Sequence, residues 1–190
     1  LIELVVVLAV LVIVAGIALT RSEAIVDDAR ATSAVATLRA VRDAIDGDAG
    51  YVADVRSDPR QIADLLRAPL GVPTYDALAH EGWRGPYLAW TGARFDTSEF
   101  GPALGFVAAY ATDGGPTVFD SWRRPLVLQP APGAVTEALR SQFLRIVSAG
   151  PDGRIDVPAA ALDFDPTDPS IVHDDVVLFV RHVHDVTGGS

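Results

Sequence analysis

The chain of 190 residues contains no cysteine, methionine, lysine or asparagine, and the missing residue types limit its chemistry. Without cysteine there is no disulfide, no cysteine-ligated zinc, no iron–sulfur cluster and no thiol nucleophile. All 15 basic residues are arginine, and the 25 acids leave a net charge of −10. Because phosphate binding depends on a cationic surface, we expect no nucleic-acid partner.

The chain has one long apolar run, at its start. Residues 1–20, LIELVVVLAVLVIVAGIALT, carry a single charge at Glu3, and every other charge lies in residues 21–190. Twenty helical residues rise about 30 Å, which is the thickness of the hydrocarbon core of a bilayer. A signal peptide needs a basic first region and a small-residue cleavage site, and the run has neither. We therefore predict a transmembrane helix over residues 1–20.

The helix is predicted to continue beyond the apolar run. Residues 21–46 contain no proline or glycine, and their apolar residues recur at the three- and four-residue spacing of one helical face. These apolar residues are Ile25, Ala29, Val35, Leu38, Val41 and Ile45. Gly47 and Gly50 indicate where the helix ends. We expect one helix of about 70 Å, with an apolar half in residues 1–20 and an amphipathic half in residues 21–50 that packs on a globular domain.

Residues 51–190 are predicted to form that globular domain. Three strand-like runs are separated by long connections rich in proline, glycine and aspartate, and the runs are 125–130, 143–150 and 175–183. A short helix is expected around 59–67, and 104–111 is either strand or helix. Because strands and helices do not alternate, we predict an α+β fold with a small antiparallel sheet packed on the long N-terminal helix.

Glu3 is the one charge inside the apolar run, and its environment has two interpretations. At the membrane interface, water and the helix N-terminus would stabilise the carboxylate. Alternatively, a neighbouring copy of the chain supplies a cation, such as a processed N-terminal amine. The residues alone leave both interpretations open.

An acidic loop over residues 150–175 is the second notable feature. It holds seven aspartates and a single arginine, and the aspartates are Asp152, Asp156, Asp163, Asp165, Asp168, Asp174 and Asp175. Calcium takes six to eight oxygen ligands, several of them carboxylate, on flexible loops with glycine turns. A solvated loop built on Asp-Pro turns explains the same residues, and composition alone favours it. The spacing of an EF-hand is absent.

Signals for other chemistry are weak. His182 and His184 share one face of a predicted strand beside Asp185, but two ligands are fewer than a zinc site needs, so an exposed strand face is favoured. There is no nucleophile elbow and no glycine-rich phosphate loop, and aromatic residues are too few for a sugar-binding cleft. The main aromatic candidates are expected in the core and in subunit contacts, namely Trp83, Tyr87, Trp90 and Trp122. We predict that the chain is not an enzyme.

The opening LIEL, with an acid two residues after the first leucine of a twenty-residue apolar helix, resembles mature type IV pilins and their relatives. Three further segments resemble the major pseudopilin of type II secretion systems: SAGPDG at 148–153 with the later Asp174-Asp175, DSWRRPLVL at 120–128, and GWRGPYL at 82–88. The chain departs from that pattern at Arg123-Arg124, which replace the usual Gly-Asn, and in a longer stretch between Asp152 and Asp174.

The resemblance implies a pilin fold and a structural subunit that a prepilin peptidase cleaves and that is then N-methylated. Such subunits lie in the inner membrane until an assembly machinery builds them into an extracytoplasmic homo-oligomeric helical filament, either a periplasmic pseudopilus or a cell-surface pilus. The apolar helices form its core, and the acid, here Glu3, pairs with the N-terminal amine of a neighbouring subunit. Leu1 is the other residue assigned to filament assembly, and the Phe–Thr pair that often precedes Leu-Ile-Glu in the family would come before it.

The resemblance also implies a calcium ion in the acidic loop. Its side-chain ligands would be Asp152, Asp174 and Asp175, and the carbonyls of Ala149 and Val172 would complete the set. Asp156 is a further candidate without family support. The alternative to a filament subunit is a single-pass, membrane-anchored extracytoplasmic module that acts as a monomer, either to bind calcium or as a hydrolase. That alternative gives Glu3 no role.

Overall fold

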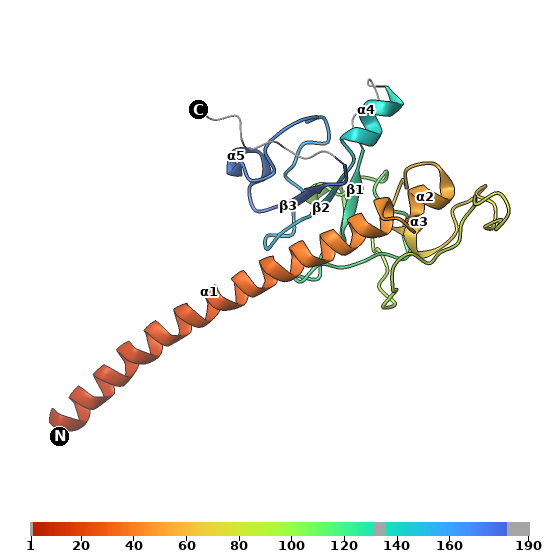
Figure 1. Cartoon of the computed structure of the whole chain (residues 1–190). Helices are drawn as coiled ribbons and strands as arrows, with labels where there is room; N and C mark the ends of the chain where they lie inside the picture. Colours follow the sequence, from red (N-terminus) through yellow and green to blue (C-terminus); the bar gives the residue numbers. More distant parts are fainter. Residues whose placement is uncertain (1, 131–135, 182–190) are drawn as a thin grey trace.

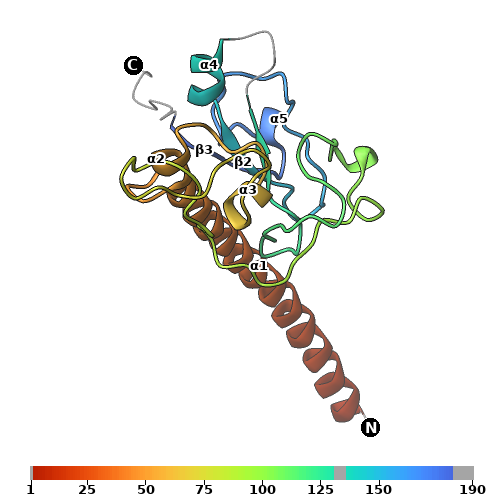
Figure 2. The same cartoon turned by 90° about the vertical axis from the view of Figure 1, so that its right-hand side faces the viewer.

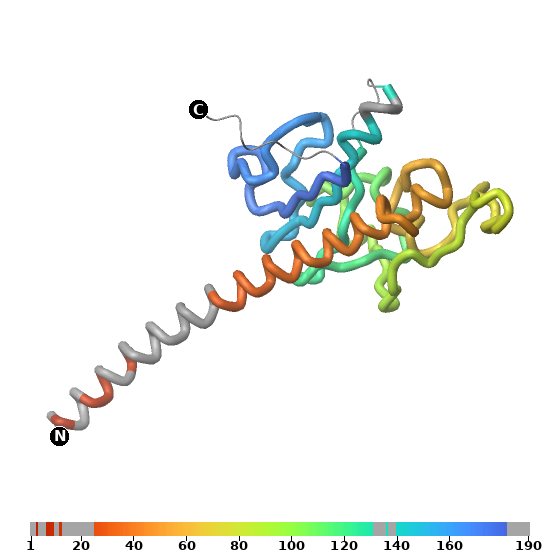
Figure 3. The backbone as a smooth tube through the Cα atoms, viewed as in Figure 1, coloured from red at the N-terminus to blue at the C-terminus, as the bar shows by residue number. Residues whose placement is uncertain are grey.

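The computed structural model of the protein describes residues 2–130 and 136–181 (Figure 1). Figure 3 shows in grey the further residues whose side chains are not described, most of them before residue 25. One long helix, α1 (Ile2–Asp46), lies with its second half along a small sheet, and its first half extends beyond the rest of the molecule (Figures 1 and 2). The predicted α+β class, a long N-terminal helix on a small antiparallel sheet, is confirmed.

The end of α1 agrees with the prediction from the two glycines. The helix ends at Asp46, and the amide of Gly47 still donates to the carbonyl of Asp43 at 2.8 Å. A Cβ on Gly47 would collide with that same carbonyl oxygen, so a residue with a side chain would have to shift the backbone. At 1.5 Å per residue the helix is about 70 Å long.

Among the described residues, no helix contains a stretch both long and apolar enough to cross a membrane. Most side chains of residues 1–20 are not described, so the transmembrane helix predicted there stays a prediction. The side chains described in this stretch include Val7, Leu8 and Val12, and all three are exposed in the single chain.

The sheet has three strands, β1 (Val127–Gln129), β2 (Arg145–Ser148) and β3 (Val176–Phe179), which are antiparallel in that order. Each strand lies inside a predicted run but is shorter than the run. Pro130 follows β1 and has no amide to donate, and Gly150 reverses the chain after β2 at a φ of 57°.

The two faces of the sheet bury different partners, because successive strand residues point to opposite sides. The face toward α1 buries large aliphatic side chains of the helix and strands, namely Leu38, Val41, Ile45, Leu128 and Ile146. The other face is covered by aromatic side chains from the loops, chiefly Phe95, Phe100, Phe106 and Phe164. The amphipathic half of α1 therefore supplies one wall of the core, as its spacing predicts for Leu38, Val41 and Ile45. Ile25 and Ala29, which belong to the same predicted face, are exposed.

Short helices occupy the connections, and they are α2 (Tyr51–Val55), α3 (Ala63–Leu66), η1 (Pro102–Leu104), α4 (Glu137–Gln142) and α5 (Pro169–Val172). The helix predicted around 59–67 is confirmed only over α3. The prediction of strand or helix over 104–111 is wrong. Gly105, at a φ of 80°, reverses the chain after η1. Phe106 is buried from an irregular segment and Tyr110 from a turn instead.

Candidate cation site and assembly helix

Three aspartates of the acidic loop meet in space. Asp152, Asp156 and Asp174 each place one carboxylate oxygen within 4.8 Å of the others. Asp152 is exposed, and the other two side chains are half-buried. Oxygens at this spacing can share a hard cation such as calcium. Two of the three are ligands that the resemblance implies, and Asp156 joins them without such support.

The sheet brings these distant residues together. Ser148, at the end of β2, is paired with Val176, at the start of β3, so the chain entering β3 passes the turn that leaves β2. Gly150 permits this close approach, because a Cβ there would collide with the carbonyl oxygen of Asp174. The amide of Asp152 then donates to Oδ2 of Asp174 at 3.0 Å.

Asp175 differs from its neighbours because it is buried, with 5% of its surface exposed. Its Oδ2 accepts the amides of Asp156 and Val157, both at 2.8 Å. Its buried Oδ1 has no hydrogen-bond partner within the described part of the chain. Burial, and then the charges of Asp156 and Asp174, raise the pKa of Asp175 to about 7. A cation beside these carboxylates would favour their ionised forms, so the donor set fits a hard metal ion.

The two carbonyl ligands that the resemblance implies belong to buried residues. The oxygen of Ala149 accepts the amide of Gly153 at 3.1 Å, and the oxygen of Val172 accepts the amide of Asp175 at 2.8 Å. A carbonyl oxygen has two lone pairs, so each retains one for a further interaction. Their role as ligands stays a prediction.

Other aspartates of the loop form its turns. Asp165 accepts the amide and the hydroxyl of Thr167 at 2.8 and 2.7 Å, and Asp168 caps α5 by accepting the amide of Ser170 at 2.9 Å. Both aspartates precede a proline, which is the arrangement that the Asp-Pro interpretation expects. The loop therefore combines turn-forming aspartates with a separate group of three that can face a cation.

The first half of α1 is the second candidate site. Val7, Leu8 and Val12 are 58%, 53% and 69% exposed, and Glu3 is also exposed. Ile25, near the start of the amphipathic half, is 70% exposed. Single apolar residues on a surface are ordinary, but several on a helix that no other segment covers are typical of an interaction surface. Figure 1 shows this half extending away from the sheet and its loops.

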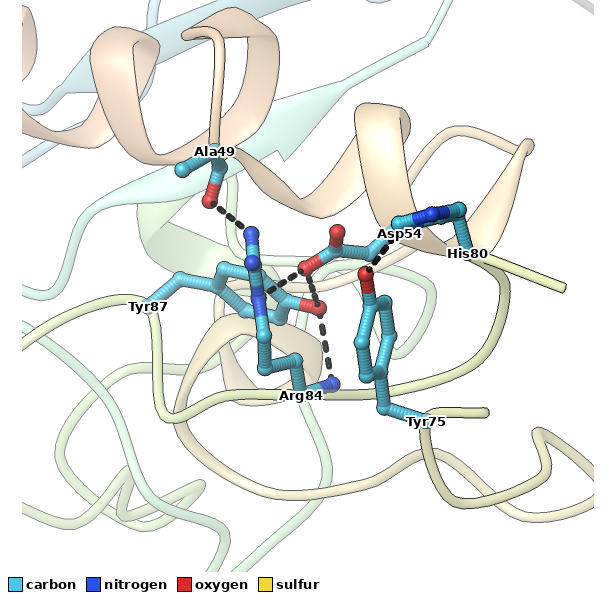
Figure 4. A network of polar contacts seen from close by, with 6 residues as sticks. All are labelled: Ala49, Asp54, Tyr75, His80, Arg84 and Tyr87. Atoms are coloured by element: carbon cyan, nitrogen blue, oxygen red, sulfur yellow. Dashed lines mark hydrogen bonds and ion pairs between the residues drawn. The ribbon is translucent and has the colours of Figure 1, made fainter. Parts of the chain in front are cut away.

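A polar network holds the GWRGPYL segment, and no pattern in the sequence predicts it (Figure 4). The carboxylate of Asp54, a buried residue of α2, accepts Nε of Arg84 and the hydroxyl of Tyr87, both at 3.0 Å. The hydroxyl of Tyr87 in turn accepts the amide of Arg84 at 3.1 Å, and the guanidinium of Arg84 lies 5.1 Å from the ring centre of Tyr75. These contacts fasten residues 82–88 to α2.

Some of the candidate residues lie outside the described part of the chain, namely Leu1, His182 and His184. The pairing of Glu3 with a neighbour's first residue and the zinc interpretation of the histidines therefore stay predictions. Trp83 and Tyr87 pack against the cluster between α1 and the sheet, whereas Trp90 is 45% exposed.

Comparisons with protein-family models, with curated proteins and with solved structures find no match to this chain.

Proposed function

We propose that this chain is a structural subunit that polymerises into a helical filament, either a type IV pilus or a type II pseudopilus. The observation that supports it best is the uncovered first half of α1. Burying a large apolar side chain is favourable by about 1.5–3 kcal/mol, so Val7, Leu8 and Val12 favour a dry environment. Helices of identical copies provide that environment when they pack side by side as the core of a fibre.

Before assembly, the same half-helix would lie in the inner membrane as a substrate of the prepilin peptidase and the assembly machinery. It would then enter the extracytoplasmic filament. Within the helix bundle an unpaired carboxylate would be strongly unfavourable, whereas a paired one specifies the axial position of each copy. We assign Glu3 this role, with the N-methylated amine of the neighbouring copy's first residue as its partner.

The first experiment tests assembly through the apolar half-helix. The full chain is purified in detergent, the detergent is withdrawn, and polymer is measured by sedimentation and electron microscopy. We expect fibres from the unchanged chain and at least about tenfold less polymer from Val12→Asp, because the bundle would have to bury a carboxylate. Val107→Asp is the matched control, because Val107 is 43% exposed on the globular part.

Equal polymer from the two valine variants would contradict assembly through α1. If the unchanged chain stays as separate molecules after detergent is withdrawn, the proposal fails, and the membrane-anchored monomer becomes the better interpretation.

Glu3→Gln tests the paired carboxylate, because it keeps the size of the side chain and removes its charge. We expect this variant to fold but to give far fewer filaments than the unchanged chain. Glu99→Gln, at an exposed position of the globular part, should assemble normally. Normal filament yield from Glu3→Gln would remove the proposed role of Glu3.

We further propose that calcium binds in the acidic loop, through Asp152, Asp174 and Asp175 with Asp156 added. Two observations support this proposal. The carboxylates of Asp152, Asp156 and Asp174 lie close together, and the buried Oδ1 of Asp175 has no hydrogen-bond partner among the described residues. The carbonyls of Ala149 and Val172 are the expected further ligands. The ion would join the turn after β2 to the start of β3, and its binding energy would add to the stability of the fold.

Thermal melts test the calcium proposal. Calcium at 100 times its dissociation constant adds about 2.7 kcal/mol, which corresponds to a rise of about 5–10 °C over the melt in EDTA. The rise should disappear in Asp152→Asn/Asp174→Asn and persist in Asp163→Asn, which changes an exposed acid outside the group of three. Identical melts of the unchanged chain in calcium and in EDTA would refute calcium binding.

A further inference from the structure

A hollow of about 600 Å³ lies beside α3 and is lined in part by Ser57, Arg60, Gln61, Arg67 and Thr112. The two arginine side chains are exposed, and neither has a hydrogen-bond or ion-pair partner among the described residues. The two acids of the hollow are already engaged. Asp58 pairs with Arg181 at 2.7 Å, and Asp64 accepts the amides of Arg60 and Gln61 at 2.8 and 3.1 Å. In a chain with a net charge of −10, two guanidinium groups that line one hollow and have no partner among the described residues favour an acidic partner.

The hollow also has an apolar edge. Leu70 lines it and is fully exposed, in a turn between Pro69 and Gly71. A partner that fits should therefore offer small apolar side chains close to carboxylates, since stable contacts combine an apolar centre with a polar rim.

This chain has such a surface in residues 158–168 of the acidic loop. Ala159 and Ala160 are exposed, and Asp163, three positions later, is exposed as well. These residues lie outside the group of three aspartates that can face a cation, so a bound ion would not neutralise them.

The two surfaces lie on different sides of the molecule. In Figure 1 the loop that carries α5 lies to the left of the sheet, and α3 lies to its right. A contact between two different faces of identical molecules leaves one face of each kind free, so it can repeat from copy to copy. It builds a closed ring if the rotation between copies closes, and an open helical chain if it does not. A helical filament requires this property of its subunit contacts.

We infer that the hollow beside α3 receives residues 158–168 of a second copy of this chain. Arg60 and Arg67 face Asp163 of that segment, and Leu70 packs on Ala159 and Ala160. The inference rests on the proposed filament, for which it names the contact between neighbouring globular parts.

Cross-linking tests the contact directly, because the chain has no cysteine of its own. Filaments of the double variant Leu70→Cys/Ala160→Cys, treated with a short bismaleimide, should yield a ladder of dimers, trimers and longer products. Each single variant should yield no covalent oligomer, since only the two different faces meet. Dimers from Leu70→Cys alone would overturn the inference, because the hollow would then meet its own copy.

Charge reversal tests the role of the arginines. Arg60→Glu/Arg67→Glu should lower polymer at least about tenfold relative to Arg56→Glu/Arg123→Glu, which reverses two exposed arginines outside the hollow. Both double variants make the net charge more negative by the same four units. The general repulsion between copies of the chain is therefore equal in the two variants. Adding Asp163→Arg to the hollow variant should restore polymer.

The outcomes separate the contact from the filament itself. If the unchanged chain forms no filament, the proposed function fails, and the contact fails with it. If filaments form but give no ladder, or if the two arginine variants assemble equally, only the contact is wrong.

Discussion

At the scale of single residues, Arg145 shows how one buried side chain can order a long loop. It is fully buried in β2 and donates to Oε1 of Gln129 at 2.9 Å. It also donates to the carbonyls of Pro158 and Ala161 at 2.9 and 2.6 Å, and its guanidinium lies 5.0 Å from the ring centre of Phe164. Burial lowers the pKa of Arg145 to about 10, so it remains charged at neutral pH. The residue therefore attaches residues 158–164 to the sheet.

Arg145→Met should destabilise the fold by about 3–5 kcal/mol, because the new side chain leaves an amide oxygen and two carbonyls without their donor. Urea unfolding of the full chain in detergent measures the loss. Arg154→Met is the control from the same loop. Its side chain is 54% exposed and its ion pair with Asp156 is long, at 4.0 Å, so the change should stay within about 0.5 kcal/mol. Equal unfolding midpoints for the two variants would show that Arg145 does not hold the loop.

The pKa of Asp175 predicts how stability depends on pH in the absence of metal. The native pKa of about 7 lies above the ordinary value of 3.8, so between these values the native state binds more protons than the unfolded state. Stability should therefore fall as pH rises from about 4 to 7, by at most about 1.4 kcal/mol per pH unit.

Urea unfolding in EDTA at several pH values measures this dependence. Asp175→Asn keeps an oxygen that can accept the amides of residues 156 and 157. In this variant the free energy of unfolding should fall less steeply with pH. Asp113→Asn, a change at an exposed carboxyl whose pKa is lowered by hydrogen bonds from Thr97, should keep the falling slope. If the free energy of unfolding falls with pH as steeply in Asp175→Asn as in the unchanged chain, Asp175 is not the group responsible for the pH dependence.

At the scale of elements, the sequence predicts the parts whose pattern is long or strongly apolar. The length of α1 follows from its spacing and from Gly47, and all three strands lie within predicted runs. Short helices such as α5 were not predicted, although Asp168 followed by Pro169 is a recognisable start signal. The run 104–111 is misleading, because only Phe106 and Tyr110 of its apolar residues are buried, and neither lies in a strand or helix.

The candidate sites could be predicted only in part. The aspartates of the candidate cation site lie up to 22 positions apart, and they meet because β2 pairs with β3. Asp54 and Arg84 lie 30 positions apart with no strand pairing between them, so no local pattern indicates their contact. Long-range contacts of this kind depend on how the loops pack, which periodicity does not describe.

The packing of α1 on the sheet gives a prediction for the amphipathic half of the helix. Leu38 is 1% exposed and lies in the cluster with Leu128 and Ile146. Leu38→Ala should lower the free energy of unfolding by about 2–5 kcal/mol, through lost burial and the cavity it leaves. Leu78→Ala is the same change at a side chain that is 95% exposed, and it should change stability by less than about 0.5 kcal/mol. Similar urea midpoints for both variants would contradict the packing of α1 on the sheet.

At the scale of the whole molecule, folding uses the second half of α1, and the proposed assembly would use the first. Among the described residues, Ala34 is the first in the chain that is buried, and the core contacts of the helix begin there. The hydroxyl of Ser121 donates a hydrogen bond to the carbonyl of Arg30 at 2.6 Å. The exposed apolar side chains of the first half of α1 all come before Arg30 in the chain. The globular part therefore has its core without the first half of the helix, and the first half has no described role inside a single molecule.

A chain that begins at residue 25 should accordingly fold and fail to polymerise. Its urea midpoint should match that of the full chain in detergent, because the removed residues contribute no described side chain to the core. Sedimentation without detergent should show a monomer, because the uncovered apolar surface that favours bundling is largely gone. A clearly lower midpoint would mean that residues before 25 stabilise the globular part, and polymer from the shortened chain would place the assembly surface outside the helix. The urea midpoint tests the packing of the second half of α1, and sedimentation tests assembly through the first half. Each result therefore shows which of the two proposals is wrong.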